Sequence, residues 1–160
     1  MFSISVHPSP GIIYLTYPGI IDFEMTTGER QTFGKNERLC RIRLIEEVFD
    51  NGNVFHTSLF KVVWMISSET LPSPAQIAVS VPKKGFRLAV TRNLIKRRIR
   101  EAYRKRKHLL YNFLKSANIQ ITFVVIYRYD AVADYTLIEQ AVGEIIEKLC
   151  VNAAGKEIKS

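Results

Sequence analysis

Cysteine, glycine, proline and long apolar runs are all scarce in this chain of 160 residues. Glycine and proline occur only 8 and 6 times, and 47% of the residues are hydrophobic, which excludes collagen-like and wholly disordered chains. Cys40 and Cys150 are far apart and lack CxxC spacing, so we expect no disulfide framework, no zinc site and a reducing cytoplasm as the compartment. No run of 18 apolar residues occurs, and no basic start precedes an apolar run at the N-terminus. We therefore predict neither a membrane span nor a secretion signal.

Acidic residues are nearly missing from one segment, residues 83–107. This segment holds 12 basic residues and a single acid, Glu101, whereas the rest of the chain has 11 basic and 14 acidic residues. Self-repulsion makes such a concentration of charge unfavourable unless a polyanion binds it. Nucleic acid is the leading partner class. An anionic membrane surface is the second, because bulky apolar residues lie opposite the charges.

The length favours one domain flanked by tails. Residues 1–33 contain three of the prolines and show no helical or strand periodicity, so we predict an N-terminal tail there. Alternatively, residues 12–17 add an edge strand to the sheet. We expect the folded domain to cover residues 34–152 and a C-terminal tail to cover residues 153–160.

The spacing of apolar residues predicts both helices and strands. Spacings of three and four predict helices at residues 36–51, 91–115 and 134–149. Alternation and β-branched residues predict strands at residues 55–67, 76–82 and 118–128, the first two forming an antiparallel hairpin. The expected buried stripe of the last helix is Leu137, Ile138, Ala141, Val142, Ile145, Ile146 and Leu149. The order predicts an α+β sandwich of one sheet with helices.

The basic segment forms two faces when it is placed on a helix at about 100° per residue. The expected core face holds Ile95, Ile99, Ala102, Leu109, Leu110 and Phe113. The opposite face holds Lys96, Arg97, Arg100, Arg104 and Lys107. Its cations recur at a spacing of about 6 Å, similar to that of successive phosphates on a nucleic-acid strand, and arginine can hold a phosphate with two hydrogen bonds. We therefore predict that this face binds nucleic acid.

The beginning of this helix also carries a specific motif. Residues 89–104 have the sequence AVTRNLIKRRIREAYR, which closely resembles the signature A-V-x-R-N-x-x-K-R-x-x-R-E-x-[FY]-R of the bacterial ribonuclease P protein component. Lys83 and Lys84 match the lysines that precede the helix in that family, and residues 37–39 and 48–52 match its first helix and glycine stop. The resemblance extends from about residue 33 to residue 149.

The resemblance implies an α/β sandwich similar to the second domain of ribosomal protein S5, in the order α-β-β-β-α-β-α. It also implies a left-handed βαβ crossover in place of the usual right-handed one. The implied function is that of the protein subunit of a ribonucleoprotein endonuclease, which removes the 5′ leader of precursor tRNA and leaves a 5′-phosphate. The RNA subunit would carry the active site and, with the substrate, the Mg²⁺ ions. The protein would bind that RNA and the leader, broaden substrate use and lower the Mg²⁺ requirement, without an obligatory protein partner.

Two sets of contacts follow from the basic helix and the resemblance together. The expected RNA-binding residues are Lys83, Lys84, Arg92, Asn93, Lys96, Arg97, Arg100, Arg104 and Lys107. The expected leader-binding residues, between the first helix and the exposed side of the sheet, are Phe49, Lys61, Ser80, Lys84, Arg92 and Asn93. The ring of Phe49 can serve equally as a core residue or as a platform on which a base stacks.

Three positions depart from the family pattern. Leu94 stands in place of the arginine that usually follows Arg-Asn, which leaves Arg92 and Asn93 as the matching pair. Ile45 stands where relatives often have an aromatic ring, so base stacking is not expected there. The loop at residues 85–88 is one residue longer than in many relatives.

Groups that could catalyse cleavage are not gathered in the sequence. His7, His56 and His108 are scattered, and we expect them to be surface or packed residues, with Cys40 and Cys150 packing against helices. Two other functions stay open: a ribosome-associated protein that binds RNA with the same helix, and a DNA-binding helix-turn-helix module. The second is disfavoured, because a strand and a lysine loop precede the basic helix where that module has a short helix.

Overall fold

The computed structural model describes residues 3–6, 13–16 and 32–157, and the chain divides into two compact units, residues 1–31 and 32–160. In the first unit, β1 (Ser3–Val6) and β2 (Ile13–Thr16) pair antiparallel as a two-stranded sheet. Most of the predicted N-terminal tail lies outside the described residues, as does His7. Where the alternative edge strand is described, it pairs with β1 and is not part of the larger sheet.

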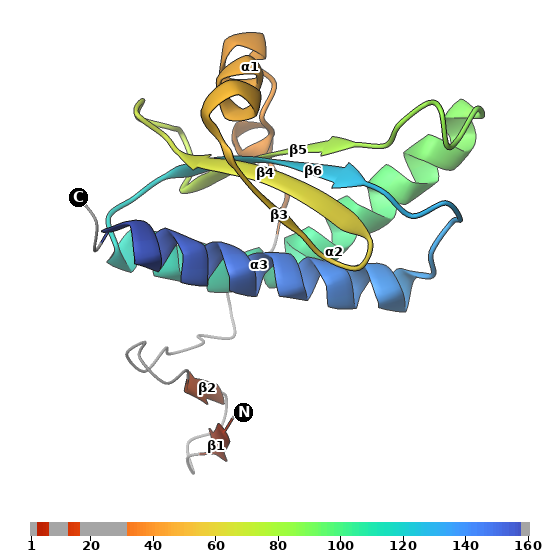
Figure 1. Ribbon diagram of the computed structural model, residues 1–160. Coiled ribbons are helices and arrows are strands. Elements are labelled where there is room, and N and C mark those ends of the chain that lie inside the picture. The colour runs from red at the N-terminus through yellow and green to blue at the C-terminus, as the bar shows by residue number, and fades with distance from the viewer. Residues whose placement is uncertain (1–2, 7–12, 17–31, 158–160) are drawn as a thin grey trace. The chain divides into compact units, whose positions relative to one another are not determined.

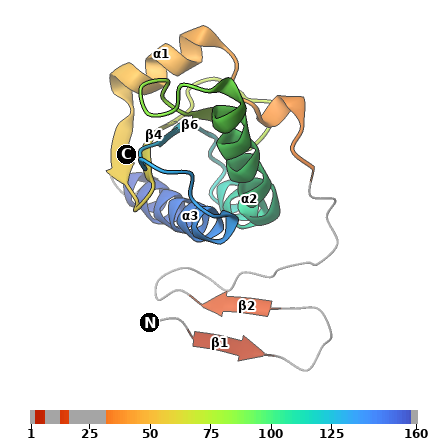
Figure 2. The same ribbon diagram turned by 90° about the vertical axis from the view of Figure 1, so that its right-hand side faces the viewer.

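The second unit is one sheet with helices on both faces (Figure 1). Its elements are η1 (Lys35–Glu37, a 3₁₀ helix), α1 (Ile42–Asn51), β3 (Asn53–His56), β4 (Phe60–Ile66), β5 (Ala75–Ser80), α2 (Ala89–Ser116), β6 (Ile121–Tyr127) and α3 (Tyr135–Glu157). Helix α1 covers one face, and α2 and α3 pack together on the other (Figures 1 and 2). The predicted α/β sandwich and the order α-β-β-β-α-β-α are confirmed.

The four strands lie in the order β3-β4-β6-β5, so the predicted pairing of the first strands is wrong. Residues 55–67 contain two strands, β3 and β4, which form the hairpin themselves. Strand β5 is parallel to β6 and is joined to it through α2, as a βαβ crossover whose left hand stays a prediction. Strand β6 is almost wholly buried, and a strand that is apolar on both sides is most stable in the centre of a covered sheet.

The first helix begins later than its apolar spacing predicts. The predicted start at Asn36 is wrong, because Arg38 and Leu39 are extended and run beside the open edge of β5, where the Leu39 N–H donates to the Ile77 carbonyl at 3.0 Å. An edge strand has unpaired backbone groups, and this contact satisfies one of them. Ile42 consequently is 73% exposed and is not a core residue.

Leu39 remains buried without being helical, and it joins Leu44 and Val48 of α1 in a small core against the sheet. Ile45 packs at the edge of that core, where no base-stacking role was expected. Cys40 precedes α1 and is exposed, so the prediction that it packs against a helix is wrong. Cys150 is half-buried on α3 beside the larger core, as predicted.

The larger core lies between the sheet and the pair α2 and α3. The predicted α2 residues Ile95, Ile99, Ala102 and Leu110 are buried, whereas Leu109 and Phe113 are only half-buried. Tyr103 and Leu114 occupy fully buried positions in their place. The buried stripe is therefore rotated toward the side of α2 that contacts η1, where the Tyr103 ring packs against Phe33 and Phe123.

Helix α3 buries the predicted stripe apart from Leu137, which is 49% exposed. The helix continues to Glu157, and Ala153 is fully buried. Residues 153–157 are thus helical, and their prediction as part of a C-terminal tail is wrong. Residues 158–160 lie outside the described residues.

Phe113→Ala tests the register of α2. Because the ring is only half-buried, we expect a loss of about 1 to 2 kcal/mol in the free energy of unfolding, less than the roughly 3 to 5 kcal/mol of a fully buried ring. Urea denaturation of the two chains measures the difference. A loss above about 3 kcal/mol contradicts the half-buried position.

Candidate nucleic-acid interface

Helix α2 carries an exposed group of cations along its N-terminal half. Asn93, Arg97 and Arg100 are exposed, and Lys96 is partly exposed. Among the residues that the structure describes, Lys96, Arg97 and Arg100 have no hydrogen-bond or ion-pair partner for their charged groups. Their charge is therefore available to a ligand, as the sequence predicted for this face.

The loop before α2 adds further cations and is held by Arg92. The Arg92 guanidinium donates to the Phe86 carbonyl at 2.8 Å and to the Arg87 carbonyl at 2.7 Å. Lys83 and Lys84 are exposed in the same loop, without a partner in the described part of the chain. The structure therefore gives Arg92 a role in positioning this loop, beside the contact that the sequence predicted for it.

The basic face is shorter than predicted, because two of its residues are engaged within the chain. Arg104 forms an ion pair with Glu101 at 2.7 Å, one turn earlier on α2. Lys107 forms an ion pair with Glu37, and each of these two side chains is only 11% exposed. The predicted exposure of Lys107 beside Arg100 is thus wrong, because its ammonium is directed at η1.

Glu37 connects η1 to α2 through several hydrogen bonds. Its carboxylate accepts from Lys107, from the Tyr111 hydroxyl at 2.7 Å and from the Gly34 N–H at 2.6 Å. Burial by itself raises the pKa of this carboxyl, but the three hydrogen bonds outweigh burial and hold the pKa below its ordinary value. The carboxylate is therefore the stable form in the folded chain.

Acid should weaken this contact in a defined range. Because the pKa of Glu37 is lower in the folded chain than the ordinary 4.5, its stabilising contribution is fully present above pH 4.5 and is lost as the pH falls through the folded value. We expect Glu37→Gln to unfold more easily than the wild type at pH 7, with the difference narrowing below pH 4.5. Denaturant unfolding at several pH values measures this; a difference that does not depend on pH contradicts the assignment.

Other arginines of α2 face α3 and are structural. Arg98 donates to the Ala133 carbonyl at 2.7 Å, and Arg106 pairs with Glu139 at 3.8 Å. The Arg106 side chain lies over Gly143, where an added Cβ would be only 3.0 Å from the guanidinium. Positive charge on α2 thus has two roles: Arg98 and Arg106 make contacts within the chain, whereas the charged groups of Lys96, Arg97 and Arg100 are open to a ligand.

A hollow of about 470 Å³ lies on the exposed face of α2. It is lined by Phe33, Leu94, Arg97, Arg98, Arg100, Glu101, Arg104 and Tyr135. Phe33 and Tyr135 bring aromatic rings to a surface to which α2 contributes four arginines. The sequence analysis missed both rings, because nothing in the spacing showed that η1 and the start of α3 lie beside α2.

The face of the sheet that carries α1 brings together three of the predicted leader-binding residues. Lys61 and Ser80 both lie beside Ile126, on the strands that flank β6, which puts their Cα atoms about 10 Å apart. Phe49 is on α1 above this face and is 48% exposed, so its ring is not a core residue. Lys84, Arg92 and Asn93 follow the end of β5 in the loop and the first turns of α2.

Other residues of the same face were missed. His56 pairs with Lys61 across β3 and β4, and Ile126 is partly exposed between Lys61 and Ser80. Val54, 50% exposed, lies one row further along. These neighbours could not be predicted because the predicted strand pairing was wrong. His56, Lys61, Ile126 and Ser80 lie in one row across the sheet only when β6 lies between β4 and β5.

The described residues also bear on metal binding and membrane insertion. In the described part of the chain, no three side chains of His, Cys, Asp or Glu are grouped so that they could hold a metal ion. Within the same residues, no helix is both long enough and apolar enough to cross a membrane.

Comparison with known proteins identifies the family. The family model described as Ribonuclease P matches residues 33–150. The Ribonuclease P protein component of Porphyromonas gingivalis (strain ATCC 33277) is 36% identical over 131 residues, which are 81% of this chain and 96% of that protein. The RNase P protein of Staphylococcus aureus has the same fold, with a TM-score of 0.58, 22% identity, and coverage of 71% of this chain and 94% of that one.

The RNase P protein from Thermotoga maritima also shares the fold, with a TM-score of 0.57 and 20% identity over 70% of this chain and 96% of that one. The family match covers the sheet, α1, α2 and all but the end of α3, and it includes the motif at the start of the basic helix. The exposed cations and the fold that positions them are thus those of a protein of the ribonuclease P family, to which this chain belongs.

Proposed function

We propose that this chain binds the RNA subunit of ribonuclease P with the cationic face of α2 and binds the 5′ leader of precursor tRNA with the sheet face that carries α1. Membership of the family gives the chain a role in ribonuclease P, and so a partnership with an RNA subunit. The observation that carries the proposal is the set of exposed or partly exposed cations without an internal partner in the described residues. They are Lys83, Lys84, Lys96, Arg97 and Arg100.

Physical chemistry favours RNA as the ligand of these cations. Exposed like charges repel one another, and the repulsion is relieved when phosphates replace the solvent ions around them. The first turns of α2 add backbone N–H groups and the positive end of the helix dipole, both of which favour phosphate. Arg92 holds the lysine loop against this end of the helix, so the loop and helix cations act on one stretch of backbone.

The leader is the proposed ligand of the other face. Lys61 supplies a charge, Ser80 leaves space beside Ile126, and the exposed ring of Phe49 offers a surface on which a base can stack. Lys84 lies in the loop between β5 and α2, and Asn93 lies in the first turns of α2. In the sequence, both residues therefore follow the strand of the leader face and precede or begin the cationic face of α2. A single strand that crosses the sheet would leave it toward the RNA-binding helix.

We further propose that the RNA subunit and the substrate hold the Mg²⁺ ions and that the chemistry of leader removal belongs to the RNA. The endonucleolytic cut would leave a 5′-phosphate on the tRNA. The protein would act by binding: its cations lower the repulsion between substrate and RNA subunit, which reduces the Mg²⁺ requirement and broadens substrate use. The two free cysteines fit a reducing compartment such as the cytoplasm.

Competition binding tests the choice of RNA. Labelled RNase P RNA is bound to the chain at about 150 mM salt, and unlabelled ribosomal RNA or duplex DNA of equal length is added. We expect unlabelled RNase P RNA to compete far better than either. Equal or better competition by ribosomal RNA supports the alternative of a ribosome-associated protein and contradicts the proposal.

A further inference from the structure

The segment that runs along the edge of the sheet before α1 carries a second group of cations. We call residues 32–43, which include the first two residues of α1, the edge segment. It is held at several points: the Leu39 N–H donates to the Ile77 carbonyl, and the Asn36 carbonyl accepts from Ser73 Oγ at 3.0 Å and from Gln76 Nε2 at 2.9 Å. These contacts fix the backbone of the segment, so a ligand that binds it loses little conformational entropy of the protein.

The exposed charge of the edge segment is positive throughout. Its cations are Lys35, Arg38, Arg41 and Arg43, and all four are exposed. Its single acid, Glu37, is buried and paired with Lys107. The segment therefore presents four cations and no acid of its own to solvent.

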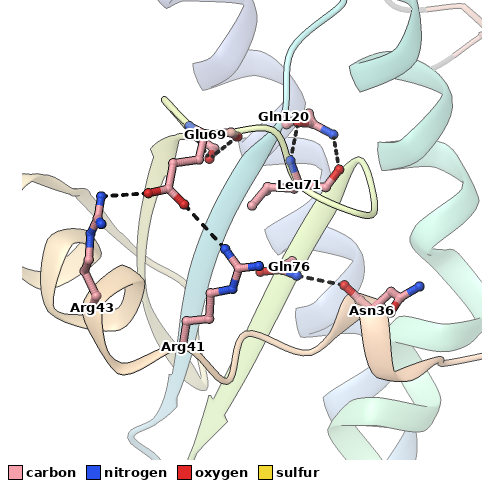
Figure 3. Close-up of polar contacts among 8 residues, drawn as sticks. Asn36, Arg41, Arg43, Glu69, Leu71, Gln76 and Gln120 are labelled. Carbon is pink, nitrogen blue, oxygen red and sulfur yellow. Dashed lines mark hydrogen bonds and ion pairs between the residues drawn. The ribbon is translucent and has the colours of Figure 1, made fainter.

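Among the described residues, Glu69 forms ion pairs with the exposed cations of this segment, and it is shared between two arginines. Glu69, in the loop between β4 and β5, pairs with Arg43 at 2.7 Å and with Arg41 at 3.5 Å (Figure 3). The arginine side chains are 81% and 65% exposed, and such exposed pairs are weak. One carboxylate cannot neutralise two guanidinium groups, so positive charge is left over, and phosphates can take the place of Glu69.

The edge segment is continuous with the cationic face of α2. Its Thr32 carbonyl accepts a hydrogen bond from Lys107 of α2, and its Phe33 ring lines the hollow that also contains Arg97 and Arg100. The Arg38 guanidinium lies over that ring at 5.5 Å from its centre. Figure 2 shows the orange ribbon of η1 beside α2. The cations thus follow one another from α2, over Phe33, to the start of α1.

We propose that the edge segment extends the RNA-binding surface of α2 and binds the RNase P RNA subunit through Arg38, Arg41 and Arg43. The inference rests on the proposed function of α2. The RNA subunit is a better partner than the leader, because Arg41 and Arg43 lie at the opposite end of α1 from Phe49. Ten helical residues separate the two ends of α1 by about 15 Å.

A cross-linker on Cys40 reports directly on this surface. Cys40 is exposed within the edge segment, whereas burial raises the pKa of the Cys150 thiol to about 12, so an alkylating azide label will react selectively at Cys40. In the holoenzyme we expect ultraviolet light to join this label to the RNA subunit. The comparison chain, Cys40→Ser with Leu94→Cys, places the same label beside the α2 cations.

Salt dependence supplies the second measurement. We expect the triple variant Arg38→Gln, Arg41→Gln, Arg43→Gln to lower the slope of log affinity for the RNA subunit against log salt by about 2 units. The matched control, Lys115→Gln, Arg128→Gln, Lys148→Gln, removes the same charge elsewhere and should change the slope by less than about half a unit.

The outcomes separate this inference from the proposed function. Cross-links from Cys40 to the RNA subunit, with a larger fall in slope for the edge variant than for the control, support the inference. Cross-links from the Leu94→Cys chain alone, or equal falls in slope, overturn it and leave the proposed function standing. Absence of cross-links from both positions overturns both, and cross-links from Cys40 to the leader overturn the assignment to the RNA subunit.

Discussion

Replacing Arg97 and Arg100 by alanine is expected to reduce the salt dependence of RNA-subunit binding by about 1.4 to 1.8 units of slope. Each lost phosphate contact removes roughly 0.7 to 0.9 units, and both guanidinium groups lack a partner in the described residues, so their whole charge is available to RNA. Filter binding at four or more salt concentrations measures the slope. The thermal midpoint of the variant should stay close to that of the wild type, since both side chains are exposed.

A second double variant distinguishes the loss of contacts between α2 and the RNA from the loss of net positive charge. Lys115→Ala with Arg128→Ala removes two exposed cations away from the α2 face and should leave the slope almost unchanged. An equal decrease in both double variants, or no decrease for Arg97→Ala with Arg100→Ala, would mean that this face does not contact the RNA.

Loss of the Phe49 ring together with Lys84 is expected to weaken binding of precursor tRNA to the holoenzyme by about 5- to 150-fold, while binding of mature tRNA is spared. Stacking of one base contributes about 1 to 3 kcal/mol, more than one solvated lysine contact, and only the precursor has a leader. Affinities of both tRNAs for the holoenzyme containing Phe49→Ala and Lys84→Ala measure this difference.

Tyr129→Ala provides the control for a lost aromatic surface. Tyr129 is 46% exposed, almost the same as Phe49, but it follows β6 in the loop to α3. We expect this variant to bind both tRNAs as the wild type does. If Phe49→Ala with Lys84→Ala weakens both tRNAs equally, these residues act through the RNA subunit or the fold, and the leader assignment must be abandoned.

The basic helix could be predicted from sequence because its information is local. A 3.6-residue period, a block of cations and a motif of 16 residues all lie within α2, so Arg97 and Arg100 were placed correctly on an exposed face. Lys107 was not, because its partner Glu37 is 70 residues away and no spacing rule connects them. Phe33 is also far from α2 in the sequence, so its position at the hollow of α2 could not be predicted.

Strand pairing was the other failure, and its cause is also non-local. Short separation in sequence favoured a hairpin of residues 55–67 with residues 76–82, but the apolar character of β6 on both faces determines the centre of the sheet. The start of α1 was misplaced for a related reason, because Arg38 and Leu39 satisfy the edge of β5 and do not continue the helix. Several residues of the leader face could therefore be predicted from the resemblance. Their arrangement in one row across the sheet, with His56, Lys61, Ile126 and Ser80 side by side, could be found only from the structure.

Cleavage of precursor tRNA by RNase P RNA at low Mg²⁺, with and without this chain, tests the central claim most directly. At a Mg²⁺ concentration where the RNA alone is nearly inactive, the account predicts that adding the chain restores accurate removal of the 5′ leader, and that Arg97→Ala with Arg100→Ala restores it only at higher protein concentration. Tight binding of the chain to ribosomal RNA, with no effect on leader removal at any Mg²⁺ concentration, would contradict the account.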